Sequence, residues 1–245
     1  AADGHDLVLV ARSEDRLTRL AAELERRYGR SVLVVPADLS TPDGVASVRR
    51  RTDAAGIAVD LLVNNAGFAT HGALVDLDPD RDREQVMVDV AAVVGLTHAY
   101  AADMVARGRG GIVNVASTAA FQPLPFMAVY GASKAFVLSF SEALRVELAG
   151  TGVTVVALCP GPTDTAFFTQ VGEEASVGGA RATPQAVVDA GLRALDRDAG
   201  TVVVGFRQRL LTALPRFLPR AVTAAVSGRI LRREADRPAA VTTGA

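Results

Sequence analysis

Three residues of the chain have side-chain types and a spacing that could together move a proton to or from a substrate oxygen atom. Tyr130 and Lys134 lie four positions apart in a stretch that predicts a helix, so their side chains share one face. Ser117 lies thirteen positions before Tyr130, at the end of a predicted strand. Because the carboxyl ends of parallel strands form the ligand crevice of an open sheet, we expect Ser117 to face a ligand.

The chemistry of this trio is proton transfer. An unperturbed tyrosine has a pKa of about 10, which is too high for a base at neutral pH. A neighbouring ammonium group favours the phenolate, so we expect Lys134 to lower the pKa of Tyr130. Tyr130 would then act as a general acid or base on a substrate oxygen that Ser117 also hydrogen-bonds. Lys134 is the only lysine among the 26 lysines and arginines. The alternative is a leftover surface lysine that lies near a tyrosine and a serine by chance.

The elements that must position these residues alternate between strand and helix. The strands are predicted at short runs that are apolar throughout, at residues 6–12, 31–36, 59–63, 111–116, 153–158 and 201–204. Helices are predicted at 14–28, from Thr41 onward, and at 81–107, 128–148 and 184–195. Strands of this kind are buried on both faces, as in a parallel sheet with helices on each side. We therefore predict a single-domain, doubly wound α/β fold of the Rossmann type, with three α/β/α layers.

Composition narrows the class of protein. Apolar residues make up 49% of the 245 residues, and the net charge of −1 excludes a globally basic nucleic-acid-binding protein. The single cysteine, Cys159, excludes an internal disulfide and indicates a reducing compartment, so we expect a cytoplasmic protein. Cys159 ends a buried strand and is expected to be inert. His5, His71 and His98 show no metal-ligand spacing, and we expect no metal site.

Four stretches together resemble the short-chain dehydrogenase/reductase family. They are Asn64-Asn65-Ala66-Gly67, Asn114-Val115-Ala116-Ser117, Tyr130-Gly-Ala-Ser-Lys134 and Pro160-Gly161-Pro162-Thr163-Asp164-Thr165. Their order and spacing fit the family over residues 5–205. The resemblance implies an NAD(P)-dependent oxidoreductase that interconverts a carbonyl and an alcohol. It implies that Tyr130 is the catalytic acid or base, that Ser117 positions the substrate oxygen, and that Lys134 binds the nicotinamide ribose.

The same resemblance implies a set of cofactor-binding residues. The turn Asn65, Ala66 and Gly67 supports the cofactor side of the sheet, and Asp38, followed by Leu39, contacts the adenine. Pro160, Gly161, Thr163 and Thr165 flank the nicotinamide. The strand at residues 6–12 ends in Arg12-Ser13 without the acid that would bind an NAD ribose. We therefore predict NADP(H), with Arg12 and Ser13 on the 2′-phosphate, and keep NAD(H) as the alternative.

Two departures from the family pattern affect these expectations. The first strand of the family and its glycine-rich phosphate turn are absent, about 20 residues judged by one strand–turn–helix unit. That strand would lie in the middle of the sheet, so we expect a gap with two exposed strand edges and a longer or truncated parent chain. A catalytically weak or inactive domain that binds a nucleotide or a partner is the alternative function.

The second departure is Asp89, where the family commonly has an asparagine in a catalytic tetrad with Ser117, Tyr130 and Lys134. We expect a charged Asp89 to raise the pKa of Lys134 and to shift the pH optimum without abolishing activity.

The last 45 residues differ from the rest in charge. From Thr201 to Ala245 there are eight arginines and two acidic residues, Glu234 and Asp236, which gives a net charge of +6. We divide the chain into a Rossmann-type domain at 1–205 and a basic helical extension and tail at 206–245, and we expect disorder from Pro238. The helices either pack on the domain with their arginines in solvent, or attach to an anionic membrane surface or a partner.

Apolar residues flank the predicted site. Between Ser117 and Tyr130 they are Phe121, Leu124, Phe126 and Met127, and after Thr165 they are Phe167 and Phe168, before a glycine-rich stretch through Gly178 and Gly179. They predict a lipophilic ketone or alcohol, such as a steroid or a fatty-acyl chain, with ordinary core packing as the alternative. The family resemblance implies a homodimer or homotetramer formed through the helices that hold Asp89 and Tyr130–Lys134.

Overall fold

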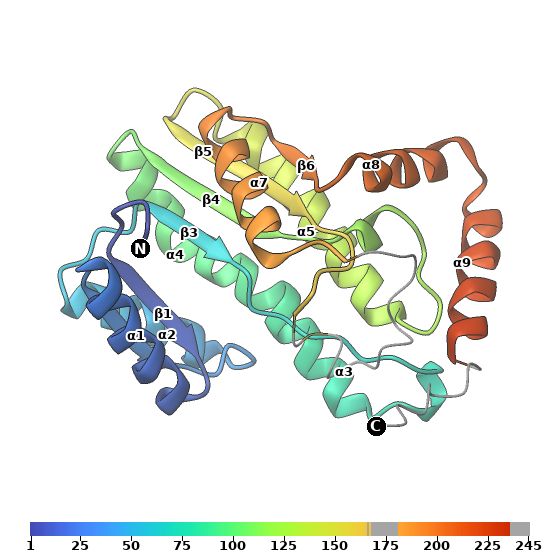
Figure 1. Cartoon of the computed structure of the whole chain (residues 1–245), viewed down its shortest axis with the longest axis horizontal. Helices are drawn as coiled ribbons and strands as arrows, with labels where there is room; N and C mark the ends of the chain where they lie inside the picture. The colour runs from blue at the N-terminus through green and yellow to red at the C-terminus, as the bar shows by residue number, and fades with distance from the viewer. Residues whose placement is uncertain (166, 168–180, 236–245) are drawn as a thin grey trace, which may run out of the picture.

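Runs of branched apolar residues form the strands, as the sequence predicts. The computed structural model describes residues 1–165, 167 and 181–235 (Figure 1). Its strands are β1 (Leu7–Ala11), β2 (Val32–Pro36), β3 (Leu61–Asn64), β4 (Gly110–Val115), β5 (Val153–Cys159) and β6 (Thr201–Val203). Its longer helices are α1 (Glu14–Tyr28), α2 (Pro42–Ala54), α3 (Pro79–Val86), α4 (Ala92–Ala106), α5 (Ala128–Glu147), α7 (Pro184–Asp196), α8 (Phe206–Ala213) and α9 (Arg220–Ala235).

The described strands are all parallel, but they form two sheets. One sheet has the order β1-β2 and the other has the order β3-β4-β5-β6. The expected gap therefore lies between β1 and β3. It leaves Val63 of β3 52% exposed, although a valine in a central parallel strand is normally covered. Figure 1 shows β1 and β2 set apart from the larger sheet.

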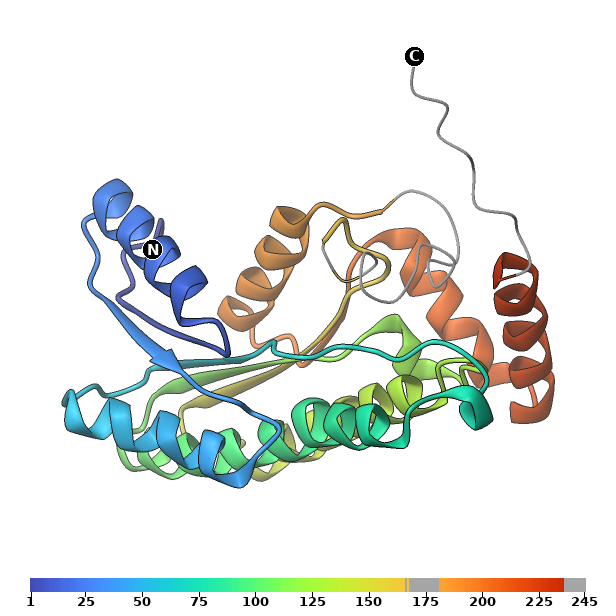
Figure 2. The ribbon, with the colours of Figure 1, turned by 90° about the horizontal axis from the view of Figure 1, so that it is seen from below.

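Helices cover both faces of the strands, which confirms the three-layer α/β/α prediction. The helices α2, α4 and α5 lie on one face, and α1 and α7 lie on the other (Figure 2). The strand residues between these layers are among the most buried that the structure describes: Val35, Ile112, Val155, Val156 and Cys159 are each 1% exposed or less. Burial on both sides explains why these strands are apolar throughout.

The helix ends follow ordinary capping chemistry. Thr41 caps α2 by accepting a hydrogen bond from the Gly44 N–H at 3.0 Å, and Gly29 ends α1 in the left-handed conformation (φ 63°). Ser13 occupies the N-cap of α1, but its side chain makes no capping hydrogen bond.

The helical stretch predicted at residues 81–107 is confirmed, and it runs without a break from Pro79 to Ala106. A π-helical turn, η2 (Met87–Ala91), separates α3 from α4 and contains Asp89. By length and composition alone, the continuous segment Pro79–Ala106 could cross a membrane. Its residues Val93, Leu96 and Met104 are buried in the cores of the molecule, which is how a helix of a folded core behaves.

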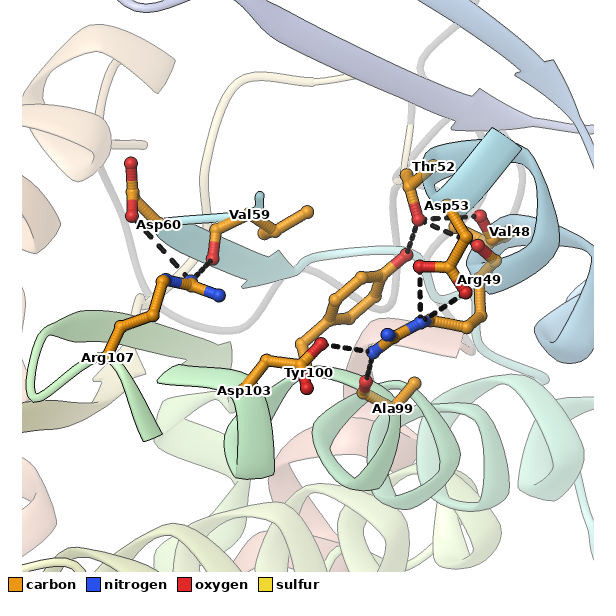
Figure 3. A network of polar contacts seen from close by, with 10 residues as sticks. All are labelled: Val48, Arg49, Thr52, Asp53, Val59, Asp60, Ala99, Tyr100, Asp103 and Arg107. Carbon is orange, nitrogen blue, oxygen red and sulfur yellow. Dashed lines mark hydrogen bonds and ion pairs between the residues drawn. The ribbon is translucent and has the colours of Figure 1, made fainter. Parts of the chain in front are cut away.

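A polar network joins α2 to α4 (Figure 3). The Arg49 guanidinium lies 2.8 Å from Asp53 and 2.7 Å from Asp103, and its Cζ lies 5.6 Å from the Tyr100 ring centroid. The hydroxyls of Thr52 and Tyr100, both buried, lie 3.0 Å apart. Next to this network, Arg107 donates to the Val59 carbonyl at 2.6 Å. These contacts fix α2 to α4, the helix that follows the π-helical turn with Asp89.

The C-terminal segment forms α8, the short helix η5 (Leu214–Phe217) and α9. A Cβ added to Gly161 would lie 2.9 Å from Gln208 of α8, so α8 packs directly on the loop after β5. The predicted disordered tail from Pro238 lies outside the described residues.

Candidate active site

One cavity of about 970 Å³ brings the predicted proton-transfer residues together. Ser117, Tyr130 and Lys134 all line it. The predicted nicotinamide-side residues Asn65, Gly67, Pro160, Gly161, Thr163 and Thr165 line the same cavity. They come from the ends of β3, β4 and β5 and from the first turns of α5, so the carboxyl edge of the sheet assembles the site.

Ser117 is held where its hydroxyl can donate into the cavity. It follows β4 and caps the short helix η3 (Thr118–Phe121), where its Oγ accepts a hydrogen bond from the Ala119 N–H at 3.1 Å. A serine hydroxyl has one proton to donate and two lone pairs, so this cap leaves the proton available. The residue is 9% exposed, which fixes the hydroxyl in place.

Lys134 is buried and forms part of a charged pair. Its Nζ donates to the Val115 carbonyl at 3.1 Å and lies 3.8 Å from Asp89 Oδ2. Asp89 is completely buried, and its Oδ1 accepts a hydrogen bond from the Phe68 N–H at 3.2 Å. Its Oδ2 has no hydrogen-bond partner among the described residues. The predicted tetrad is therefore present, with an ammonium and a carboxylate that are close but not hydrogen-bonded.

The expectation that Lys134 lowers the pKa of Tyr130 is wrong for this structure. Burial raises the pKa of Tyr130 to about 12, because the phenolate would lose its hydration. Hydrogen bonding to Ser117 acts in the opposite direction, and the Asp89 carboxylate adds to the rise. The Lys134 Nζ lies 5.7 Å from the centroid of the phenol ring. Tyr130 is therefore protonated at neutral pH.

Burial also decides the protonation of the Asp89–Lys134 pair. It raises the pKa of Asp89 to about 6, although the Lys134 charge and the Phe68 hydrogen bond act to lower it. Asp89 does act to raise the pKa of Lys134, as expected, but burial outweighs it and the net change is downward. The expected rise in the pKa of Lys134 is therefore wrong, because burial removes both charged groups from water.

Gly67 allows the strand end to approach this pair closely. A Cβ at this position would lie 2.6 Å from Asp89 Oδ1 and 3.4 Å from Lys134 Nζ. Gly67 and its neighbours Asn65 and Ala66 are exposed above the cavity. The absence of a side chain at Gly67 thus keeps the space beside Lys134 Nζ open to hydroxyl groups such as those of a nicotinamide ribose.

The predicted adenine-side residues lie outside the cavity. The Arg12 guanidinium forms an ion pair with Glu84 at 2.9 Å, and its side chain is 65% exposed. The Asp38 carboxylate accepts hydrogen bonds from the Ser40 N–H and hydroxyl, which lower its pKa. Leu39 is buried in the core. The Ser13 hydroxyl at the N-terminus of α1 makes no capping hydrogen bond. Together with Arg12 it fits a phosphate group, once the ion pair between Arg12 and Glu84 is broken.

Apolar side chains form the far wall of the cavity. Phe121, Leu124, Met127 and Phe167 line it, as predicted, and the Phe167 ring centroid lies 5.6 Å from that of Tyr130. Phe126 points elsewhere and lines a smaller cavity. Phe168, Gly178 and Gly179 lie outside the described residues. Burial raises the pKa of the Cys159 thiol to about 12, in line with an inert thiol.

Sequence reasoning did not assign the C-terminal helices to the site. Gln208, Leu211, Leu214, Leu218, Val226 and Ile230 all line the cavity. The helical spacing of Leu211, Leu214 and Leu218 was the available signal, but it equally fits packing on the domain.

Comparison with known proteins agrees with this geometry. A family model described as short chain dehydrogenase matches residues 1–176. "Probable oxidoreductase EphD" of Mycobacterium tuberculosis is 30% identical over 249 aligned positions, which include 94% of this chain and 42% of that protein. The chain thus spans less than half the length of that relative.

Solved structures show the same likeness. A short-chain dehydrogenase from Sphingobium yanoikuyae in complex with NADPH is 32% identical, with a TM-score of 0.77 over 100% of this chain and 91% of that one. A 7beta-hydroxysteroid dehydrogenase structure is 27% identical, with a TM-score of 0.83 over 93% of this chain and 88% of that one.

Proposed function

Because the chain belongs to the short-chain dehydrogenase family, we propose that it is an NADP(H)-dependent oxidoreductase that interconverts a carbonyl and an alcohol on a lipophilic substrate. The observation that carries this proposal is the single cavity of about 970 Å³ lined by Ser117, Tyr130 and Lys134. Its volume exceeds what a small polar ketone fills, and its far wall is apolar.

The chain's own residues perform the proton transfer. Tyr130 gives a proton from its hydroxyl to the substrate oxygen during reduction, and takes it back during oxidation. Ser117 donates a hydrogen bond to the same oxygen and stabilises the negative charge that develops there. Lys134 would hold the ribose of a bound cofactor through its ammonium protons. The nicotinamide, when bound, supplies or accepts the hydride.

Reduction is the direction that the protonation states favour. A phenol with a pKa near 12 is a proton donor across the physiological range. Oxidation of an alcohol needs the phenolate, which burial makes costly here. We therefore propose that the domain works as a carbonyl reductase at neutral pH.

Arg12 supports the choice of NADP(H). It directly follows β1, at the position where an acid would select NAD(H), and the first acidic residue after it is Glu14. The NADPH in the Sphingobium yanoikuyae structure supports the same cofactor.

A ketone panel tests the proposal. NADPH oxidation by the purified chain is followed with ketones of increasing apolar size, from a short 2-ketone to a steroid ketone. We expect kcat/KM to rise about fourfold per buried methylene over the first few added groups. The Tyr130→Phe variant should bind NADPH with unchanged affinity and lose turnover by a factor of about 10² or more. Turnover that survives in Tyr130→Phe would overturn the role of the phenol.

The second candidate is a catalytically weak or inactive domain that binds a nucleotide or a partner, and the gap between the two described sheets is the observation that favours it. The gap lies beside β1, whose end carries Arg12, so it falls at the cofactor side of the molecule. Saturable NADPH binding with no reduction of any ketone would establish this alternative.

We also propose that the chain forms a homo-oligomer through α4 and α5. The α5 surface presents Phe136, 42% exposed, stacked on Phe140, and Val146, 76% exposed. Light scattering during size-exclusion chromatography measures the assembly, and Phe136→Ser should reduce it to a monomer.

A further inference from the structure

The C-terminal helices expose an unusual concentration of large apolar side chains. The described residues include eighteen exposed large hydrophobic residues, and nine of them lie between residues 206 and 230. We call these nine the C-terminal apolar surface: Phe206, Leu210, Leu211, Leu214, Phe217, Leu218, Val222, Val226 and Ile230. Phe206 and Phe217 are the most exposed, at 76% and 83%. Single exposed leucines are ordinary, but such a cluster marks an interaction site.

The apolar residues form stripes along the helices. Phe206, Leu210 and Leu214 are spaced four apart, and Val222, Val226 and Ile230 repeat that spacing on α9. Residues four apart share one face of a helix, so each stripe is continuous. Figures 1 and 2 show α9 at the end of the molecule farthest from α1, with α8 leading toward it.

The same segment carries only positive charge. Between Phe206 and Arg233 there are seven arginines and no acidic residue, so this segment is +7 and the remainder of the chain is −8. Arg216, Arg220 and Arg229 are exposed beside the apolar stripes. Arg232 lies over the Phe126 ring, with its Cζ 5.5 Å from the centroid, and ties α9 to the domain.

We propose that the C-terminal apolar surface binds the surface of an anionic phospholipid bilayer. Exposed leucine, valine and phenylalanine side chains gain by entering the acyl boundary, and arginines gain from anionic headgroups. A nucleic acid would satisfy the arginines but would leave the aliphatic stripes in water.

The surface is continuous with the mouth of the active-site cavity. Leu211, Leu214, Leu218, Val226 and Ile230 belong to the surface and also line the cavity that contains Ser117. A bilayer at this position therefore faces the opening, and a lipophilic ketone can enter from the acyl region. This delivery route rests on the proposed function, whereas bilayer binding does not.

Vesicle sedimentation of the full chain, without cofactor or substrate, tests the proposal. We expect binding to vesicles of phosphatidylcholine and phosphatidylserine, weaker binding to phosphatidylcholine alone, and loss at high salt. The triple variant Arg216→Gln/Arg220→Gln/Arg229→Gln should bind about a hundredfold more weakly, since each arginine near an anionic surface contributes about fivefold. The variant Phe206→Ser/Phe217→Ser should lose about tenfold or more per ring.

Matched variants elsewhere control for charge and hydrophobicity. Arg16→Gln/Arg19→Gln/Arg26→Gln changes three exposed arginines of α1, and Leu74→Ser/Val75→Ser removes two side chains that are 60% and 91% exposed. Both should bind vesicles like the unmodified chain.

Equal loss in the test and control variants would overturn the proposal, as would no binding to anionic vesicles. Self-association that Phe206→Ser/Phe217→Ser abolishes, without vesicle binding, would assign the surface to a second copy instead. Neither phenylalanine lines the cavity, so reduction of a water-soluble ketone by that variant should be unchanged. A chain that binds vesicles but reduces no ketone would refute the proposed function alone.

Discussion

Replacing Asp89 by asparagine should change how the stability of the protein depends on pH. The native state raises the pKa of this carboxyl from 3.8 to about 6, so it holds the proton more tightly than the unfolded chain does. A group of this kind favours folding while it is protonated. Its contribution is lost as the pH rises from 3.8 through 6, where the unfolded chain ionises first.

The size of this loss follows from the shift. A difference of about two pKa units corresponds to about 3 kcal/mol of unfolding free energy, complete at pH values well above 6. About 2 kcal/mol of it falls between roughly pH 4.5 and pH 7.5. Asparagine has no charge to bury, so the unfolding free energy of the Asp89→Asn variant does not decrease in this way as the pH rises. Relative to the unmodified chain, Asp89→Asn should gain about 2 kcal/mol between these two pH values.

Urea unfolding of both proteins at the two pH values measures this difference directly. Asp43→Asn is the matched control, because the Asp43 side chain is 86% exposed. This replacement should alter the change in unfolding free energy between the two pH values by less than about 1 kcal/mol. In parallel, the pH–rate profile of the unmodified enzyme should bend near pH 6, and the bend should be absent in Asp89→Asn. A free-energy difference between Asp89→Asn and the unmodified chain that stays constant from pH 4.5 to 7.5 would refute the reasoning.

Three further predictions concern other parts of the molecule. Gly67→Ala places a Cβ 2.6 Å from Asp89 Oδ1, so we expect about 1–3 kcal/mol lower stability and weaker NADPH binding, measured by thermal unfolding and fluorescence titration. Arg12→Gln should weaken NADPH binding about tenfold and leave NADH binding unchanged; equal effects on both would remove Arg12 from the phosphate site. Tyr100→Phe deletes the hydroxyl 3.0 Å from that of Thr52 and should lower the unfolding free energy by about 1 kcal/mol, with activity unchanged.

The strand and helix pattern was predictable because it depends on local sequence. Runs such as Val153–Cys159 are buried on both faces and therefore contain no polar residue except Thr154. Thr41 and Gly29 mark helix ends through their own backbone and side-chain chemistry. The gap between β1 and β3 was also predictable, because strand order in this fold class places an absent first strand between them.

The electrostatics of the site were not predictable from spacing. The interval between Tyr130 and Lys134 suggests a phenol with a lowered pKa. The direction of the pKa shift, however, depends on how far the surrounding chain removes the phenol from water. The same holds for Arg12, whose partner Glu84 is 72 positions away in the sequence. Charges are placed by tertiary packing, and a local motif contains no information about the remote groups that approach it.

The single lysine of this chain gives the site a distinct spectroscopic label. Protein produced with ¹⁵N-labelled lysine carries one labelled amino group, that of Lys134, whose side chain is 8% exposed. Its chemical shift would report the ionisation of the neighbouring carboxylate, the arrival of a nucleotide and the approach of a ketone, with no other lysine signal to separate. Lys134, which we propose holds the cofactor ribose, can thus serve as a built-in reporter of each step in the reaction cycle.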